Sequence, residues 1–136
     1  MKIVLDTNCL VNVIMPGSYN NDIWQAFRAS KYTLCVTNEI LYEYHEILAK
    51  PYNLIIANTV LKELMEAPNL ERVNPTYRFN LITADPDDNK FVDCAVIAGA
   101  TYIVSNDRHF DELKRYDFPK VDVRKLSEFL NIVRTL

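Results

Sequence analysis

The stretch KIVLDTNCLVNVI, residues 2–14, places an aspartate between two apolar segments. Residues 3–5 contain no polar side chain, which is typical of a strand buried in a parallel sheet. After Asp6 the apolar residues continue, and they predict a short helix over residues 8–15 that Pro16 ends. Asp6 therefore either caps this helix or binds a ligand, and the rest of the sequence has to distinguish the two roles.

The remainder of the chain alternates between strand and helix patterns in the same way. Further strands are predicted at residues 33–36, 71–73, 102–104 and 121–123. Helices are predicted at residues 21–30, 39–50, 55–67, 85–98, 108–114 and 127–136, while residues 74–84 show no clear pattern. This alternation predicts an α/β fold in which helices cover both faces of a parallel sheet. A length of 136 residues predicts a single domain.

Composition excludes several classes of protein. Two glycines are too few for Gly-rich nucleotide-binding loops, and two histidines are too few for a His-rich metal centre. The three cysteines lie far apart in apolar segments, which favours buried thiols in a reducing compartment. No apolar run approaches the roughly 18 residues of a membrane span, and the pattern of a signal peptide is missing. We therefore expect a cytoplasmic protein that does not enter membranes.

Acidic residues follow two of the predicted strands. Asp6 comes directly after residues 3–5, and Asp107 follows residues 102–104. Ligands of parallel α/β sheets bind beyond the carboxyl ends of the strands. If these two strands are neighbours, their carboxylates converge on one crevice. Each aspartate could instead cap the helix that comes after it.

Other acids lie within predicted helices. Asp93 has apolar neighbours on both sides in FVDCAVIA, residues 91–98, and a buried unpaired carboxylate is costly, so it needs a partner. Lys90 is the obvious local cation. Asp88 suits the first turn of the helix and lies roughly 140° around it from Asp93, at about 100° per residue. Glu43 either joins the other acids or faces solvent on its own helix.

Four converging carboxylates would repel one another and raise their pKa values unless a cation lay among them. Oxygen ligands without histidine or cysteine favour Mg²⁺ or Mn²⁺. Such an ion can activate water and stabilise phosphate charge during phosphodiester cleavage. The net charge of −3 gives no general attraction for nucleic acid, but a bound divalent ion would make the acidic crevice a phosphate-binding site.

The segments that carry these acids resemble one family. VLDTN (residues 4–8), TNEILYEYHEIL (37–48) and DPDDNKFVDCAVIAGATYIVSND (85–107) are similar to PIN-domain ribonucleases, and especially to toxin components of bacterial and archaeal toxin-antitoxin systems. The resemblance covers essentially the whole chain, residues 1–136. It implies a three-layer α/β/α sandwich with a central parallel sheet and a metal-dependent endoribonuclease site. It also implies an RNA substrate, a homodimer and a cognate antitoxin protein.

Catalytic roles carry over from the family residue by residue. The residues that match its acidic catalytic site are Asp6, Glu43, Asp93 and Asp107. We expect Asp6, Asp93 and Asp107 to hold Mg²⁺ or Mn²⁺. Glu43 and Asp88 are two further candidates for contact with the metal.

Substrate-binding roles fall on smaller polar residues. Asn8 and Ser105 match polar positions near the metal of the family and are expected to bind the substrate. Ser105 stands where threonine is commoner, and it keeps the hydroxyl group. Arg108 and Lys90 are candidate phosphate contacts.

Two other functions are compatible with the sequence. A non-catalytic PIN-like module would bind RNA or a partner protein with the same fold. A haloacid-dehalogenase-like phosphatase would use Asp6 as its nucleophile, but that chemistry wants a second acid two residues later, where the chain has Asn8. Hydrolysis of RNA at a four-carboxylate site is the interpretation that uses all the acids.

Overall fold

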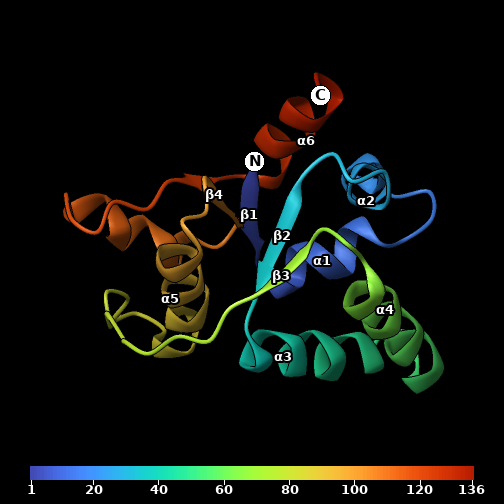
Figure 1. Ribbon diagram of the computed structural model, residues 1–136, viewed down its shortest axis with the longest axis horizontal. Coiled ribbons are helices and arrows are strands. Elements are labelled where there is room, and N and C mark those ends of the chain that lie inside the picture. The colour runs from blue at the N-terminus through green and yellow to red at the C-terminus, as the bar shows by residue number, and fades with distance from the viewer.

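The computed structural model describes all 136 residues, and its strands and helices alternate along the chain (Figure 1). The elements in order are β1 (Lys2–Leu5), α1 (Thr7–Val13), α2 (Asn21–Arg28), β2 (Thr33–Val36), α3 (Asn38–Ala49), α4 (Leu54–Glu66), β3 (Leu70–Arg72), the 3₁₀ helix η1 (Pro86–Asp88), α5 (Asn89–Ala98), β4 (Tyr102–Val104), the 3₁₀ helix η2 (Arg108–Arg115), β5 (Val123–Arg124) and α6 (Leu126–Arg134). None of these helices has the length and apolarity needed to cross a bilayer.

The five strands form one parallel sheet in the order β3-β2-β1-β4-β5. Helix α5 packs against β1, β2 and β4 on one side of this sheet, and α1 and α2 lie on the other side (Figure 1). The predicted α/β fold with a central parallel sheet is therefore confirmed. The order also makes β1 and β4 neighbours, although about a hundred residues separate them in the sequence.

The core is one continuous cluster of buried apolar side chains centred on the sheet. Ile3, Val4 and Leu5 are at most 1% exposed, as expected of a strand covered on both faces. Burying side chains of this kind stabilises a fold by about 1.5–3 kcal/mol each. Cys9 and Cys35 belong to this core, as does Cys94, and all three are free thiols, so the predicted burial of the cysteines is confirmed.

Local capping follows the sequence signals at two helices. The Thr37 hydroxyl accepts a hydrogen bond from the backbone N–H of Ile40 at 3.1 Å and caps α3. The Asp85 carboxylate accepts one from Asp87 N at 3.1 Å. The predicted helix 85–98 is divided, because one 3₁₀ turn, η1, precedes the α-helical part. This turn sets the position of the acids in DPDD.

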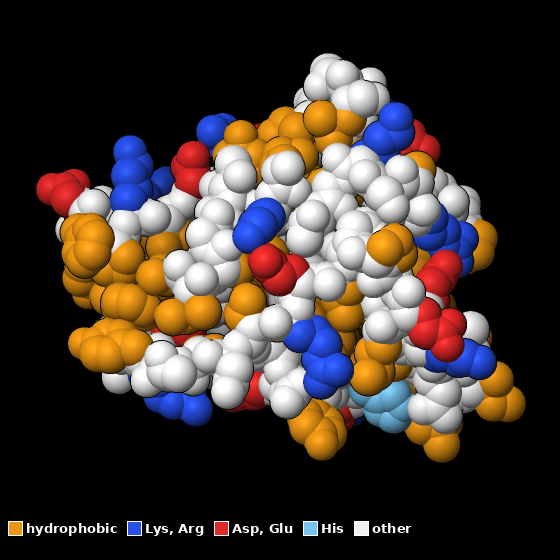
Figure 2. Space-filling view, viewed as in Figure 1, with side chains coloured by type: hydrophobic (Ala, Val, Ile, Leu, Met, Phe, Trp, Pro, Cys, Tyr) orange, Lys and Arg blue, Asp and Glu red, His pale blue; other side chains and the backbone are white.

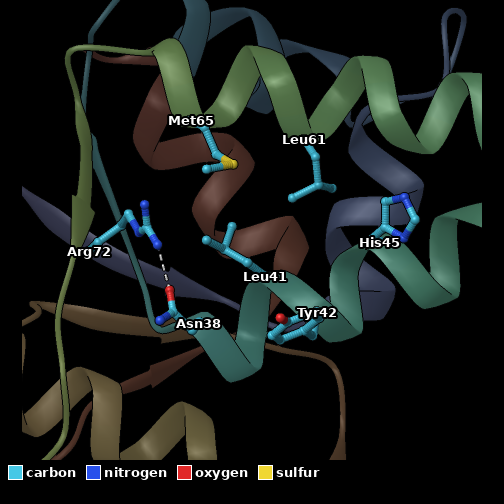
Figure 3. Close-up of a pocket in the computed structure, with 7 residues that line it drawn as sticks. All are labelled: Asn38, Leu41, Tyr42, His45, Leu61, Met65 and Arg72. Carbon is cyan, nitrogen blue, oxygen red and sulfur yellow. Dashed lines mark hydrogen bonds between the residues drawn. The ribbon is translucent and has the colours of Figure 1, made fainter.

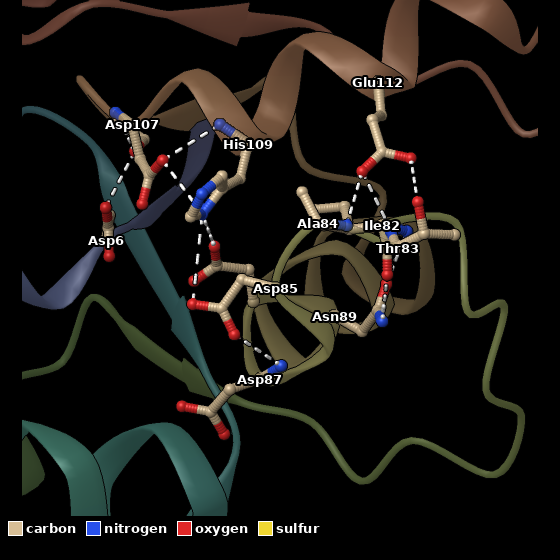
Figure 4. Close-up of polar contacts among 12 residues, drawn as sticks. Asp6, Ile82, Thr83, Ala84, Asp85, Asp87, Asn89, Asp107, His109 and Glu112 are labelled. Atoms are coloured by element: carbon tan, nitrogen blue, oxygen red, sulfur yellow. Dashed lines mark hydrogen bonds and ion pairs between the residues drawn. The ribbon is translucent and has the colours of Figure 1, made fainter.

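The segment before η1 has no regular structure, but side chains hold it in place (Figure 4). The Asn89 amide accepts from Ile82 N at 2.9 Å and donates to Ile82 O at 3.0 Å. Glu112 of η2 accepts from the backbone N–H groups of Thr83 and Ala84 at 2.9 and 2.8 Å. These side chains supply hydrogen-bond partners for backbone groups that no helix or strand pairs. They also fix the position of the chain before η1.

Candidate metal centre

Two aspartates meet where β1 and β4 end. Leu5 pairs with Val104, and the Asp6 backbone N–H continues the ladder by donating to Val104 O at 3.0 Å. The buried Ser105 hydroxyl donates to Asp6 Oδ2 at 2.7 Å and accepts from Asp107 N at 3.0 Å. Because Ser105 holds both residues, the carboxylates of Asp6 and Asp107 are directed to the same end of the sheet (Figure 4).

His109 joins these strand-end acids to the acids of η1 (Figure 4). Its Nδ1 lies 3.2 Å from Asp88 Oδ2, 3.2 Å from Asp107 Oδ1 and 3.9 Å from Asp85 Oδ2. Its backbone N–H also donates to Asp107 Oδ1 at 2.9 Å. One ligand atom from each of Asp85, Asp88 and His109 lies within 4.8 Å of the others, a spacing that one metal ion can bridge.

Burial and mutual repulsion displace the pKa values of these groups. The pKa of Asp88 is raised from 3.8 to about 6, chiefly because the carboxyl group is removed from water. Repulsion from the carboxylates of Asp6, Asp85 and Asp107 contributes to this rise. Burial also raises the pKa of Asp6, and the hydrogen bond with Asp88 raises the pKa of His109. A cation among the carboxylates would relieve the repulsion.

Glu43 reaches toward this site from α3, but both of its oxygens are occupied. Lys90 Nζ lies 2.8 Å from Glu43 Oε1, and the Thr7 hydroxyl donates to Oε2. Lys90 also contacts Asp87, with which it forms an ion pair at 2.9 Å. Burial alone would lower the pKa of Lys90, but its bonds to Glu43 and Asp87 raise it above the ordinary value. The ammonium group therefore stays protonated and forms ion pairs with two acids.

Asp93 lies apart from the other predicted acids. Its Oδ1 accepts a hydrogen bond from Phe79 N at 3.0 Å, and the residue is 2% exposed. It lines a small polar pocket with Arg78 and Glu39, the charged groups that act on its pKa, which burial raises. The structure therefore does not bring Asp93 together with Asp6 and Asp107.

The position beside Asp6 and Asp107 is taken by Asp88 instead. Asp88 is the N-cap residue of α5, and Asp93 comes more than one turn later on the same helix. Five residues correspond to about 140° of rotation, so the two side chains leave the helix in different directions. The sequence named Asp88 only as a further candidate for the metal, because an acid in the first turn of a helix also suits the electrostatics of the helix.

A groove of about 290 Å³ opens over the strand-end acids, and Asp6, Asn8, Asn106 and Asp107 are among the residues that line it. Asn8 is exposed in this groove, at the start of α1. Arg108 is exposed next to Asp107 and forms no ion pair within 4.0 Å. Both side chains remain available to a substrate.

A larger pocket of about 460 Å³ lies between α3 and α4 (Figure 3). Leu41, Leu61 and Met65 supply its apolar wall, and the Arg72 guanidinium donates to Asn38 Oδ1 at 2.6 Å at one end. No carboxylate lines this pocket. It therefore offers no carboxylate ligand for a hard cation.

The structure adds two residues that the sequence interpretation did not select, Asp85 and His109. Both stand within segments already singled out, Asp85 at the start of DPDD and His109 two residues after Asp107. Their proximity to each other depends on the packing of η1 against η2, which no short-range pattern reveals. The carboxylates suit Mg²⁺ or Mn²⁺ and the imidazole suits a transition-metal ion, so the donor set fits a divalent cation.

Comparisons with known proteins agree with this architecture. A family model described as PIN domain matches residues 2–109, which include Asp6, Asp88 and Asp107. No protein of curated function matches the sequence. A chain of VapBC2 from Rickettsia felis, crystallised bound to a DNA fragment from their promoter, is similar in fold, with a TM-score of 0.62 at 18% identity over 92% of this chain and 98% of that chain. Since the family model covers most of the sequence, the chain belongs to the PIN domain family.

Proposed function

We propose that this chain is a metal-dependent endoribonuclease that acts in the cytoplasm as the toxin of a toxin-antitoxin pair. The chief support is that Asp6 and Asp107 line an open groove at the carboxyl end of the sheet, with Asp88 joined to Asp107 through His109. A divalent cation held there would activate water for attack on a phosphodiester and offset charge on the phosphate. Membership of the PIN domain family supports the same assignment.

Each side chain has a distinct role in this proposal. Asp6, Asp88 and Asp107 would hold Mg²⁺ or Mn²⁺, and His109 would either add a nitrogen ligand or orient Asp88 and Asp107. Ser105 is a positioning residue, because its hydroxyl group bonds to both Asp6 and the backbone of Asp107. Asp93, which the sequence placed among the ligands, has no part in this arrangement.

The substrate is proposed to be single-stranded or looped RNA. The net charge of −3 gives no general attraction for phosphate, and on the face that Figure 2 shows, lysine and arginine side chains are interspersed with acids. Attraction for phosphate therefore has to come from the bound cation and from a few local contacts, with Arg108 and Asn8 as the candidates. Such local binding suits a short stretch of flexible backbone that can enter the groove.

Cleavage of a labelled single-stranded RNA tests the function directly. We expect cleavage with Mn²⁺ or Mg²⁺, none with EDTA, and none by Asp6→Asn, because that variant loses a charge from the metal site. Asp111→Asn is the matched control, since Asp111 is an exposed acid of η2 paired only with Lys114. Cleavage that survives EDTA, or full activity of Asp6→Asn, would contradict the proposal.

Two further measurements, of RNA binding and of phosphoaspartate formation, separate the alternatives. RNA binding without cleavage, unaffected by Asp6→Asn, would identify a non-catalytic module. A phosphoaspartate trapped from a small phosphate ester would identify a phosphatase, although Asn8 stands where that chemistry needs its second acid. A DNA strand of the same sequence shows whether the 2′-hydroxyl of RNA is required.

Metal binding should also stabilise the fold. We expect millimolar Mn²⁺ to raise the melting temperature of the EDTA-treated protein, because a ligand bound only by the native state stabilises it by about 2.7 kcal/mol at one hundred times its dissociation constant. Asp6→Asn should lose most of this rise, whereas Asp111→Asn should keep it. Differential scanning calorimetry measures the shift, and an equal rise in all three proteins would contradict a specific site.

Partners belong to the same proposal. We propose a cognate antitoxin protein as partner and self-association into a homodimer. The similarity in fold to a chain of VapBC2 supports an antitoxin partner, and the family resemblance supports the homodimer.

A further inference from the structure

The ammonium group of Lys90 lies where acidic groups from two elements meet. Its Nζ is 2.8 Å from Glu43 Oε1 on α3 and 2.9 Å from Asp87 Oδ2 on η1. It also donates to the backbone carbonyl of Asp87 at 2.9 Å. The Lys90 side chain is only 5% exposed. Three oxygen atoms from two separate elements thus surround one buried positive charge.

We propose that Lys90 takes the place of a second metal ion, so that this centre binds a single divalent cation. The inference rests on the proposed metal-dependent function and concerns the number of ions and the role of Glu43. In two-metal sites of enzymes that cleave phosphodiesters, carboxylates hold two ions about 3.5–4 Å apart. Here the carboxylates of Glu43 and Asp87 already have a cation, the ammonium group of Lys90.

The distribution of positive charge supports this division. Neither Asp6 nor Asp88 has a lysine or arginine within 4.0 Å, and His109 is the one basic side chain that contacts Asp88 and Asp107. Glu43 and Asp87, in contrast, share Lys90. Asp6, Asp88 and Asp107 therefore need a cation from solution to relieve their repulsion. Glu43 and Asp87 do not, because Lys90 supplies one.

A metal ion at Glu43 would compete with the partners that its two carboxylate oxygens already have. Lys90 occupies one of its oxygens, and the Thr7 hydroxyl occupies the other. Releasing Lys90 would leave this nearly buried ammonium group with Asp87 as its one acidic partner, which is unfavourable. Glu43 is thus assigned as the positioning residue for Lys90 and not as a metal ligand.

Lys90 is also unsuited to the role of phosphate contact. An ammonium group has three protons to donate, and Glu43 Oε1, Asp87 Oδ2 and Asp87 O accept from it. No proton remains for a substrate. Its Nζ lies 5.3 Å from the centre of the Phe91 ring, a further favourable contact for the charge in this position.

Counting bound Mn²⁺ by electron paramagnetic resonance tests the inference, because free Mn²⁺ gives a sharp signal that binding broadens. We expect one ion per chain in the wild type. Lys90→Met should bind two, since Glu43 and Asp87 are released as ligands, and Lys90→Met combined with Glu43→Gln should return to one. Lys62→Met, which changes an exposed lysine of α4, is the control and should bind one.

Each count has a definite meaning. Two ions in the wild type, or one in a folded Lys90→Met variant, would overturn the role of Lys90 and leave the nuclease assignment intact. No ion in the wild type would overturn the proposed metal centre itself. Circular dichroism establishes that each variant is folded. If Lys90→Met does not fold, the wild-type count and the double variant decide the question.

Discussion

Asp88→Asn should slow RNA cleavage by at least about 100-fold, whereas Asp93→Asn should retain most of the activity. Groups that only orient metal ligands cost 10–100-fold when they are removed, so the loss of a ligand should cost at least as much. Asp88 lies beside His109 at 3.2 Å and is acted on by the charges of Asp6 and Asp107, while Asp93 accepts a hydrogen bond from Phe79 in a different pocket.

Single-turnover rates at saturating Mn²⁺ measure this difference without a contribution from product release. Asparagine is the appropriate replacement at both positions because it keeps the size of the side chain and, at residue 93, an oxygen that can accept from Phe79 N. Melting curves control for loss of folded protein. A large loss of rate at Asp93 and none at Asp88 would reverse the assignment and favour the ligand set expected from the sequence.

The second large effect concerns stability without metal. Because burial raises the pKa of Asp88 from 3.8 to about 6, the folded protein holds this proton more tightly than the unfolded chain does. The free energy of unfolding should therefore fall as pH rises between these two values and stay low above them. Asp88→Asn has no such proton to lose. At pH 7.5 it should be more stable than the wild type, by about 3 kcal/mol at most.

Urea unfolding in EDTA at pH 3.5 and 7.5 tests this expectation, and the stability gain of Asp88→Asn should appear only at the higher pH. Asp87→Asn, in the same turn, is a control that should change the free energy of unfolding in the opposite direction. The hydrogen bond with Lys90 lowers the pKa of Asp87, so the charged form of this residue stabilises the fold and its removal should be unfavourable at pH 7.5. Equal effects of the two substitutions would contradict the electrostatic account.

Asp6 and Asp107 could be selected from sequence because they follow apolar strands, whereas Ser105 came from the family resemblance. In a parallel sheet the end of a strand is a fixed place, so the strand pattern alone directs these residues to one edge. What it does not supply is the order of the strands. The adjacency of β1 and β4 came from the family resemblance, and the structure provides the register, Leu5 with Val104.

The helical acids were harder to place because a helix turns by about 100° per residue and a small change of phase moves a side chain to another face. Asp93 stood out because its sequence neighbours are apolar, yet a backbone N–H from the irregular segment 74–84 satisfies it. Lys90 was visible as a cation near the acids. Its three acceptors depend on the approach of α3 to η1, which is a tertiary contact.

The hydrogen bond between Ser105 and Asp6 has a consequence for the time at which the protein becomes active during its synthesis. These two residues are 99 positions apart, and Asp6 is correctly held only after β4 has docked beside β1. A nascent chain that has not yet released Asp107 from the ribosome has only part of the acidic cluster. The proposed nuclease would therefore remain inactive toward RNA at the ribosome that makes it until nearly four fifths of the chain has emerged.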